Sequence, residues 1–383
     1  MMRLAFKHFL TAMLVILALF AFSFSTSATE FGVELPDGTW ESFEESVPDD
    51  VSRYFTDGAF EDEKSYFSAV EGMTEPKSIA LVLLELFGIE MSAAFSLLLL
   101  LLAVTLISAA LSTVSAGSGS GALKAVMRFC SLGGVFCASG YIFYSHFERL
   151  EEFFGRLATF MNGMIPITAT IWALGGNVTT ASAGSATLYC FLTVFEKLWA
   201  ASAVPIFAVL LTLGFCDVLC GELKSGRVLG TVKRIYGFFL GLTMTILLSS
   251  LAAQTTLTAV ADSVTARTGR LVTSTVIPIV GGNLGESLRT VASSVIYLKS
   301  IFGIGGIIIV ALLTLPTAIS LLLTRFSFGI ASTFADILGC EDESKLLSSF
   351  SDAYGCVLAV VAGSGMTFVL SFCIFMKTAV AVA

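Results

Sequence analysis

Long apolar runs with few or no charged residues dominate the sequence from position 79 onward. The strongest covers 91–114 and includes an unbroken leucine stretch at 97–102. A helix needs about 20 consecutive apolar residues to cross a bilayer. Further runs follow at 129–147, 162–175, 186–216, 236–257, 301–324 and 354–376. The pattern predicts an all-α polytopic membrane protein with about six full transmembrane helices, two broken or re-entrant segments and amphipathic interfacial helices.

Two stretches differ from a simple span. Residues 148–161 place apolar side chains on one helical stripe and charged ones on another, which predicts an interfacial helix. The apolar stripe contains Leu150, Phe153, Phe154, Leu157, Phe160 and Met161. The run 186–216 contains Glu196, Lys197 and Pro205, so it is either one long kinked helix or two short ones.

Two apolar pieces resemble each other and predict breaks in helices. Each places Ile-Pro-Ile ahead of Gly-Gly-Asn, and the residues in question are Pro166, Gly175, Gly176, Asn177, Pro278, Gly281, Gly282 and Asn283. Broken membrane segments are tolerated where protein or water surrounds them, and paired breaks are typical of transport sites in duplicated folds. The pieces are therefore candidate cavity-lining segments. Chance occurrence of Pro and Gly remains the alternative to a true internal repeat.

Glu286 and Arg289 flank the second piece and share a helical face with Ser293 and Tyr297. Ionisable residues inside a membrane are costly and often functional. One interpretation is a polar face that lines a cavity or pore. The other is an interfacial helix whose Arg289 and Lys299 lie among the lipid headgroups.

The composition excludes an ordinary soluble enzyme. Hydrophobic residues make up 56% and charged residues 13% of the 383 positions, against about 25% charge in a typical soluble domain. The acidity is local, since positions 30–77 hold 14 Asp and Glu against three basic residues. We therefore divide the chain into three parts: a signal peptide at 1–28, an acidic extracytoplasmic segment at 29–78, and a membrane domain at 79–383.

Residues 1–28 have the pattern of a signal peptide. Arg3 and Lys7 precede an apolar stretch at 9–24, and small residues follow at 25–28. An uncleaved first transmembrane helix is the alternative. Either interpretation places the acidic segment outside the cytoplasm.

Basic residues predict which connections face the cytoplasm. Lys124 and Arg128 follow the first span, and the loop at 217–234 carries four basic residues against two acidic ones. The positive-inside rule places both loops in the cytoplasm. Arg325 suggests that 301–324 returns to the same side, which leaves the C-terminus outside.

The sequence offers little for catalysis. It has no P-loop and no H-E-x-x-H motif, and its only histidines are His8 and His146. The eight cysteines lie mostly in apolar runs, and Cys216 and Cys220 make a weak metal pair without a nearby histidine. We predict no catalytic residue, no metal and no cofactor.

The order of several short motifs resembles the stage III sporulation protein AE family. One run reads Lys233-x-x-Tyr236-Gly237-x-x-Leu240-Gly241, and Gln254, Asp262-Ser263 and Arg267-Thr268 follow it. The most specific stretch runs from Ile277 through Gly282 to Ser287, Val291, Ser293-Ser294, Leu298-Lys299 and Gly303-x-x-Gly306. The likeness is best over about 230–310.

The resemblance implies a membrane component of a secretion-like channel, made in the mother cell of an endospore-forming bacterium. It implies three kinds of partner: other sporulation IIIA membrane proteins, a separate ATPase and a partner in the forespore membrane. It implies a location in the mother-cell membrane around the forespore and no nucleic-acid partner. It supplies no catalytic residues. A secondary transporter and the permease subunit of an ATP-driven exporter remain the alternatives.

Overall fold

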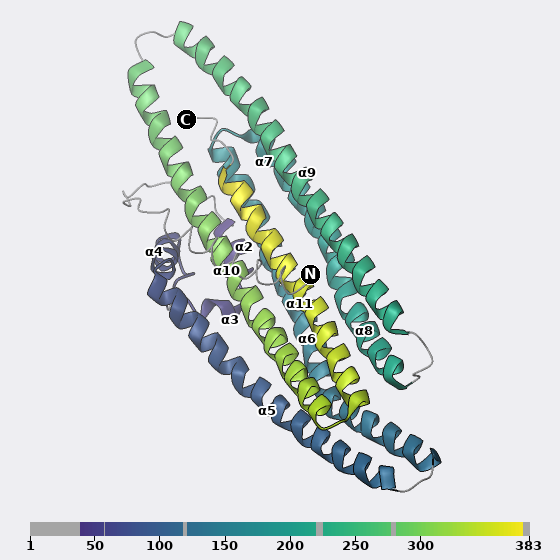
Figure 1. Cartoon of the computed structure of the whole chain (residues 1–383). Helices are drawn as coiled ribbons and strands as arrows, with labels where there is room; N and C mark the ends of the chain where they lie inside the picture. The colour runs from purple at the N-terminus through teal and green to yellow at the C-terminus, as the bar shows by residue number, and fades with distance from the viewer. Residues whose placement is uncertain (1–38, 57, 118–120, 220–224, 277–280, 378–383) are drawn as a thin grey trace.

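The structure, a computed structural model, describes residues 39–56, 58–117, 121–219, 225–276 and 281–377. The described part folds into helices (Figure 1). Three short ones come first: α2 (Thr39–Glu44), α3 (Asp49–Ser52) and α4 (Glu63–Met73). The long ones are α5 (Pro76–Gly117), α6 (Gly121–Leu174), α7 (Val178–Phe195), α8 (Ala201–Leu219), α9 (Ser225–Val276), α10 (Gly281–Ile337) and α11 (Glu341–Lys377). A π-helical turn, Glu196–Ala200, joins α7 to α8.

Six helical stretches are long and apolar enough to cross a membrane, which confirms the predicted all-α polytopic class. They are Lys77–Thr113, Gly121–Leu174, Thr180–Leu219, Val228–Ala253, Ser293–Ile337 and Glu341–Met376. Each overlaps one of the predicted apolar runs. Consecutive stretches run antiparallel, so the junctions α5–α6, α8–α9 and α10–α11 lie toward one end of the bundle (Figure 1).

Several helices are much longer than a bilayer is thick. The 54 residues of α6 and the 57 of α10 each extend for about 80 Å at 1.5 Å per residue. The hydrocarbon core of a membrane measures only about 30 Å. Large parts of these helices must therefore lie outside any single bilayer.

The paired helices α10 and α11 form the centre of the bundle. In the most apolar window of each, 67% of the residues are buried, against 17% for the α9 span. Phe328, Phe350, Tyr354 and Phe368 are fully enclosed there. Helix α9, in contrast, exposes Phe238 and Phe239. Because α9 leaves its apolar residues uncovered, its outer face has the character of a lipid-facing surface.

Two local predictions need correction. Residues 162–175 are not a short separate piece but the last part of α6, which continues through Pro166. Residues 148–161 form no separate interfacial helix, because they lie in the middle of the same α6. Their predicted apolar stripe is real, but it packs inside the bundle, where all six of its members are buried. For the run 186–216, the structure shows the first of the two predicted alternatives, one continuous helix, with a π-helical turn ahead of Pro205.

The described part of the acidic segment packs on the bundle through aromatic side chains. Phe43 of α2 and Tyr66 of α4 are fully buried and have ring centroids 5.1 Å apart. Both rings also contact Phe302 of α10, at 5.6 and 5.5 Å. At the start of α4, the side chain of Ser65 and then its backbone N–H donate hydrogen bonds to the Asp62 carboxylate, and both lower the pKa of Asp62. Aromatic burial thus holds an otherwise acidic segment against α6 and α10.

Two junctions end a helix with a glycine in the left-handed conformation. Gly176, at φ +77°, separates α6 from α7, and Gly339, also at φ +77°, separates α10 from α11. In each case the next residue donates its backbone N–H to a carbonyl five positions back, at 2.9 Å. This pairing closes the helix end as a Schellman motif. Glycine is favoured because a Cβ is strained at this φ.

Candidate functional site

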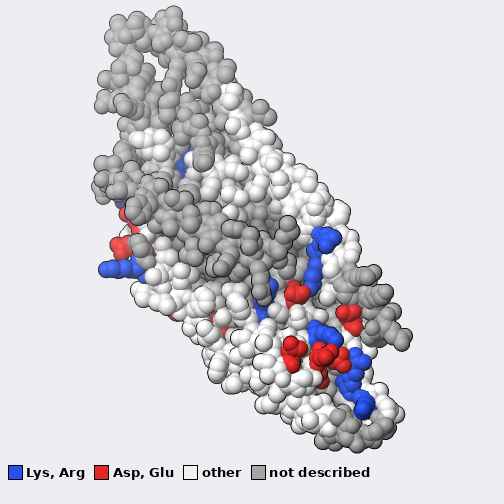
Figure 2. Space-filling model, viewed as in Figure 1, with Lys and Arg blue, Asp and Glu red and all other residues white. Residues whose placement is uncertain are grey.

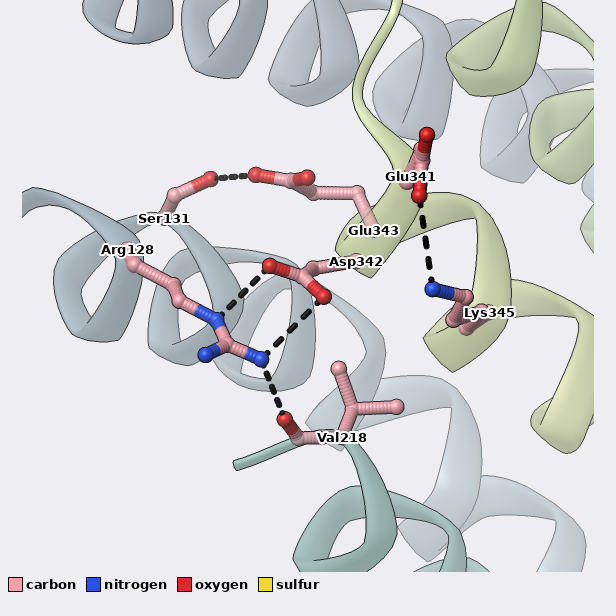
Figure 3. A network of polar contacts seen from close by, with 7 residues as sticks. All are labelled: Arg128, Ser131, Val218, Glu341, Asp342, Glu343 and Lys345. Carbon is pink, nitrogen blue, oxygen red and sulfur yellow. Dashed lines mark hydrogen bonds and ion pairs between the residues drawn. The ribbon is translucent and has the colours of Figure 1, made fainter. Parts of the chain in front are cut away.

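A polar junction ties together the end of the bundle where α5–α6, α8–α9 and α10–α11 meet. The Arg128 guanidinium, near the start of α6, donates to the Val218 carbonyl at the end of α8, at 2.8 Å. The same guanidinium pairs with Asp342 in the first turn of α11, at 2.7 and 3.1 Å (Figure 3). One side chain thus bridges three helix ends. The contacts match helix dipoles, because a cation stabilises a helix C-terminus and a carboxylate stabilises an N-terminus.

The carboxylate of Glu343 is buried beside this junction. It accepts a hydrogen bond from the Ser131 hydroxyl of α6 (Figure 3). The Ser131 oxygen lies 2.7 Å from the Ser108 hydroxyl of α5, so a chain of hydroxyl groups leads from α5 to α11. The acidic run Glu341-Asp342-Glu343 therefore forms the first turn of α11, where the helix dipole favours negative charge.

Charged side chains gather at the same end on the surface. On the face shown in Figure 2, Lys, Arg, Asp and Glu cluster around the ends of α6, α8 and α11, and a second group lies beside α4. Lys345 pairs with Glu341 at 3.5 Å, and Lys233 pairs with Asp352 at 3.4 Å. Basic and acidic groups alternate, so this end forms a network of pairs and not a single-sign surface.

Arg128→Ala is expected to lower the free energy of unfolding by about 1–2 kcal/mol, because it removes a charged hydrogen bond and a partly exposed ion pair. Arg128→Lys should recover only part of this loss, since an ammonium cannot bridge Val218 and Asp342 with the same fork geometry. Thermal unfolding in detergent measures both. Lys124→Ala, at an exposed site one turn earlier, is the matched control and should behave as the unaltered protein.

One buried histidine, His146, and the hydroxyl groups around it form a polar layer at the centre of the bundle. The Nδ1 atom of His146 lies 2.8 Å from the Ile142 carbonyl and 3.3 Å from the Tyr354 hydroxyl. Since the carbonyl can only accept, Nδ1 carries the proton and Nε2 is left as an acceptor. Nε2 lies 3.4 Å from the hydroxyl oxygens of Ser320 and Thr324. The layer joins α6, α10 and α11 through one imidazole.

Ion pairs adjoin this layer. Arg149 of α6 donates to Glu90 of α5 at 2.6 Å. Two turns further along α6, Arg156 pairs with Glu152 of its own helix and with Asp50 of α3. The uncharged stretch of α6 between Arg128 and Glu148 is therefore bounded at both ends by charged groups. Its length of about 30 Å matches a hydrocarbon core.

The first predicted broken segment lies at the α6–α7 junction. Pro166 is exposed within α6, whereas Gly175, Gly176 and Asn177 connect the two helices. A Cβ added to Gly175 would lie 3.2 Å from Val295 of α10, so the junction packs closely on α10. Asn177 is buried, and its backbone carbonyl accepts a hydrogen bond from the Ala181 backbone N–H at 2.8 Å.

The second predicted segment is only partly described. Pro278 lies outside the described residues. The backbone of Gly281, Gly282 and Asn283 forms the first turn of α10, and Glu286 and Arg289 follow in the same helix. Their side chains lie outside the described part, so a cavity-lining role for these five residues stays a prediction. Further along α10, Val295 and Leu298 are buried.

Among the described residues, no group of three or more His, Cys, Asp and Glu side chains is placed to hold a metal ion. The described cysteines are all free thiols, and Cys220 lies outside the described part.

Two groups of glycines near the starts of spans differ in how closely they pack. Gly303, Gly305 and Gly306 pack against other elements, whereas Gly237 and Gly241 face open space.

Sequence reasoning missed the two polar features that the fold assembles. Arg128 and Asp342 are 214 positions apart, so no local pattern links them. His146 lies near the end of the apolar run 129–147, but α6 continues for 28 residues beyond it. A local signal did exist for the end of α10, because Gly339 ahead of three acidic residues is typical of a helix stop followed by a helix start.

Comparison with known proteins gives the family. The sequence model of stage III sporulation protein AE matches residues 62–379, which include all six candidate spans. The chain belongs to the stage III sporulation protein AE family. Stage III sporulation protein AE of Bacillus subtilis (strain 168) is 22% identical over 229 residues. That alignment covers 60% of this chain and 57% of the relative, so the chain spans a little over half of the relative's length. No solved structure matches.

The family match extends the resemblance seen in the sequence. The motifs of 230–310 lie inside it, and so do the acidic turn Glu341-Asp342-Glu343 and the last span. The polar junction therefore belongs to the part of the chain that the family shares. Membership and six apolar helices identify a multi-pass membrane protein of a sporulation family.

Proposed function

We propose that the protein is a non-enzymatic component of the sporulation IIIA channel, a secretion-like complex that links mother cell and forespore. Its place is the mother-cell membrane around the forespore. Its partners are other sporulation IIIA membrane proteins, a separate ATPase and a protein of the forespore membrane. Family membership supports the stage of development, and the bundle supports a scaffold or conduit.

The observation that carries the proposal is the length of the helices. Helix α6 crosses a hydrocarbon core between Arg128 and Glu148 and then continues to Leu174. That extension adds about 40 Å of helix outside the membrane. A component that bridges two apposed membranes needs structure on the outer side of its own bilayer, and the part of α6 beyond Glu148 supplies it.

Deletion of the gene is expected to arrest development after engulfment, with normal vegetative growth. Late forespore gene activity, followed by a fluorescent reporter, should be lost and should return when the intact gene is supplied. The purified protein alone should hydrolyse no ATP. A deletion strain that forms spores at the normal frequency would contradict the proposal.

The buried layer around His146 favours one second candidate, a secondary transporter. An imidazole enclosed by Ser320, Thr324 and Tyr354 is the kind of intramembrane polar group that transporters use. Ion-coupled, substrate-specific uptake by the purified protein in liposomes would support it. If no such uptake is found and the deletion strain arrests, the results would favour the channel component over the transporter.

A further inference from the structure

An open pocket of about 540 Å³ lies between α6 and the helix that contains the π-helical turn and α8. Its size falls in the range of ligand and side-chain pockets, about 300–1,000 Å³. Glu151, Gly155, Ala158 and Asn162 line it from α6, and Ala200 and Ala201 line it from the other wall. The small side chains on both walls account for the hollow.

The pocket has the form of a groove along α6. Positions 151, 155, 158 and 162 are spaced by four, three and four residues, so they form one row along the helix. The row is about 16 Å long. A Cβ added to Gly155 would meet no atom within 4 Å, so the floor of the groove is open. A straight groove with a floor of small residues suits an elongated occupant, as in membrane helix pairs.

The charge of the groove restricts its occupant. Glu151 lies in the lining, and no basic residue is among the described lining residues. No described residue forms an ion pair with Glu151, whereas the neighbouring Glu152 is paired with Arg156. The groove therefore offers a carboxylate beside apolar walls, which is complementary to an apolar segment with one basic side chain.

The groove begins just beyond the uncharged stretch of α6. Glu151 is three residues past Glu148, at the level where a transmembrane helix emerges from the hydrocarbon core. Lys and Arg are favourable at such an interface, because their stems cover apolar surface while their charged ends reach water. We propose that the groove binds a helix of a different membrane subunit, whose Lys or Arg pairs with Glu151. The proposal rests on the proposed function, because it assigns one subunit contact of the channel.

Photo-cross-linking in sporulating cells tests the occupant. A photo-reactive amino acid replaces Ala201, which is exposed in the groove. In the control it replaces Tyr141, which lies on α6 outside the groove and is 79% exposed. Mass spectrometry of the Ala201 product should identify an apolar peptide of another chain that contains Lys or Arg. Products that contain only lipid, a second copy of this chain or residues 1–38 of this chain would overturn the proposal. So would the same products from both positions.

Two pairs of variants test the groove itself. Gly155→Trp should reduce the Ala201 cross-link about tenfold or more by filling the groove. Gly134→Trp, at an α6 glycine that also meets no atom within 4 Å, should not reduce it. Glu151→Lys should weaken the cross-link, and the exposed neighbour Glu148→Lys should leave it nearly unchanged. Exchange of the partner's basic residue for Glu should restore binding to Glu151→Lys.

Equal cross-linking by Gly155→Trp and Gly134→Trp would overturn the groove assignment. This failure is distinct from a failure of the proposed function. If the deletion strain arrests while Gly155→Trp forms spores and cross-links normally, only the groove assignment is wrong. If the deletion strain itself forms spores normally, the channel role is wrong.

Discussion

Gly305→Leu is expected to detach α4 from the bundle and to lower the free energy of unfolding by about 1–3 kcal/mol. A Cβ at Gly305 of α10 would overlap the Tyr66 hydroxyl and lie 3.1 Å from Val70. Tyr66 is fully buried, and its hydroxyl has no hydrogen-bond partner among the described residues. The ring therefore depends on close packing over the glycine. Thermal unfolding in detergent and proteolysis between α3 and α4 measure the loss.

Gly237→Leu is the matched control for this change. Gly237 lies on an apolar helix, as Gly305 does, but a Cβ there would meet nothing within 4 Å. The variant should unfold at nearly the same temperature as the unaltered protein. Equal destabilisation by both variants, or a protease-resistant Gly305→Leu, would show that α4 does not dock on α10 as described.

Tyr354→Ala is expected to cost about 3–5 kcal/mol, the range for removing a large buried ring. Tyr354 of α11 is fully enclosed, and its ring centroid lies 4.9 Å from Phe207 and 5.4 Å from Phe328. The side chain joins α8, α10 and α11, so its loss leaves a cavity at the bundle centre. Chemical denaturation in detergent, followed by tryptophan fluorescence, measures the change.

Two further variants separate the ring from its hydroxyl. Tyr354→Phe keeps the packing and loses only the contact with His146, so it should cost about 1 kcal/mol. Tyr141→Ala removes a tyrosine that is 79% exposed and should change stability little. If Tyr354→Phe is as damaging as Tyr354→Ala, the hydrogen bond to His146 matters more than the packing.

The spans could be predicted because charge is excluded from the hydrocarbon core. Residues 91–114 and 129–147 stand out for that reason, and both fall within helices. The ends of the helices could not be predicted from the same signal. Helix α6 continues past Glu148 and Pro166, because tertiary contacts of Phe154 and Phe160 stabilise residues that are too polar for a span.

The candidate site was less predictable than the fold. The Gly-Gly-Asn motif correctly marks a helix boundary at Gly175–Asn177, because Gly176 takes a positive φ. The partners of Arg128 and His146 come from distant helices, and composition and spacing carry no information on such contacts. The basic charge of Arg128 suggested which end of the bundle it occupies. The carbonyl and carboxylate that it binds required the structure.

Sidedness in the membrane is the most direct test of the central claim, a six-span bundle with α2–α4 outside and the Arg128 junction in the cytoplasm. Ser42→Cys and Lys345→Cys each place a new thiol at an exposed position, one in α2 and one beside the junction. The protein is produced in growing cells and treated with an impermeant thiol reagent, with the otherwise unaltered chain as baseline. Ser42→Cys should be labelled in intact cells, and Lys345→Cys should be labelled only after the cytoplasm is opened. The reverse order, or labelling of both thiols from one side, would contradict it.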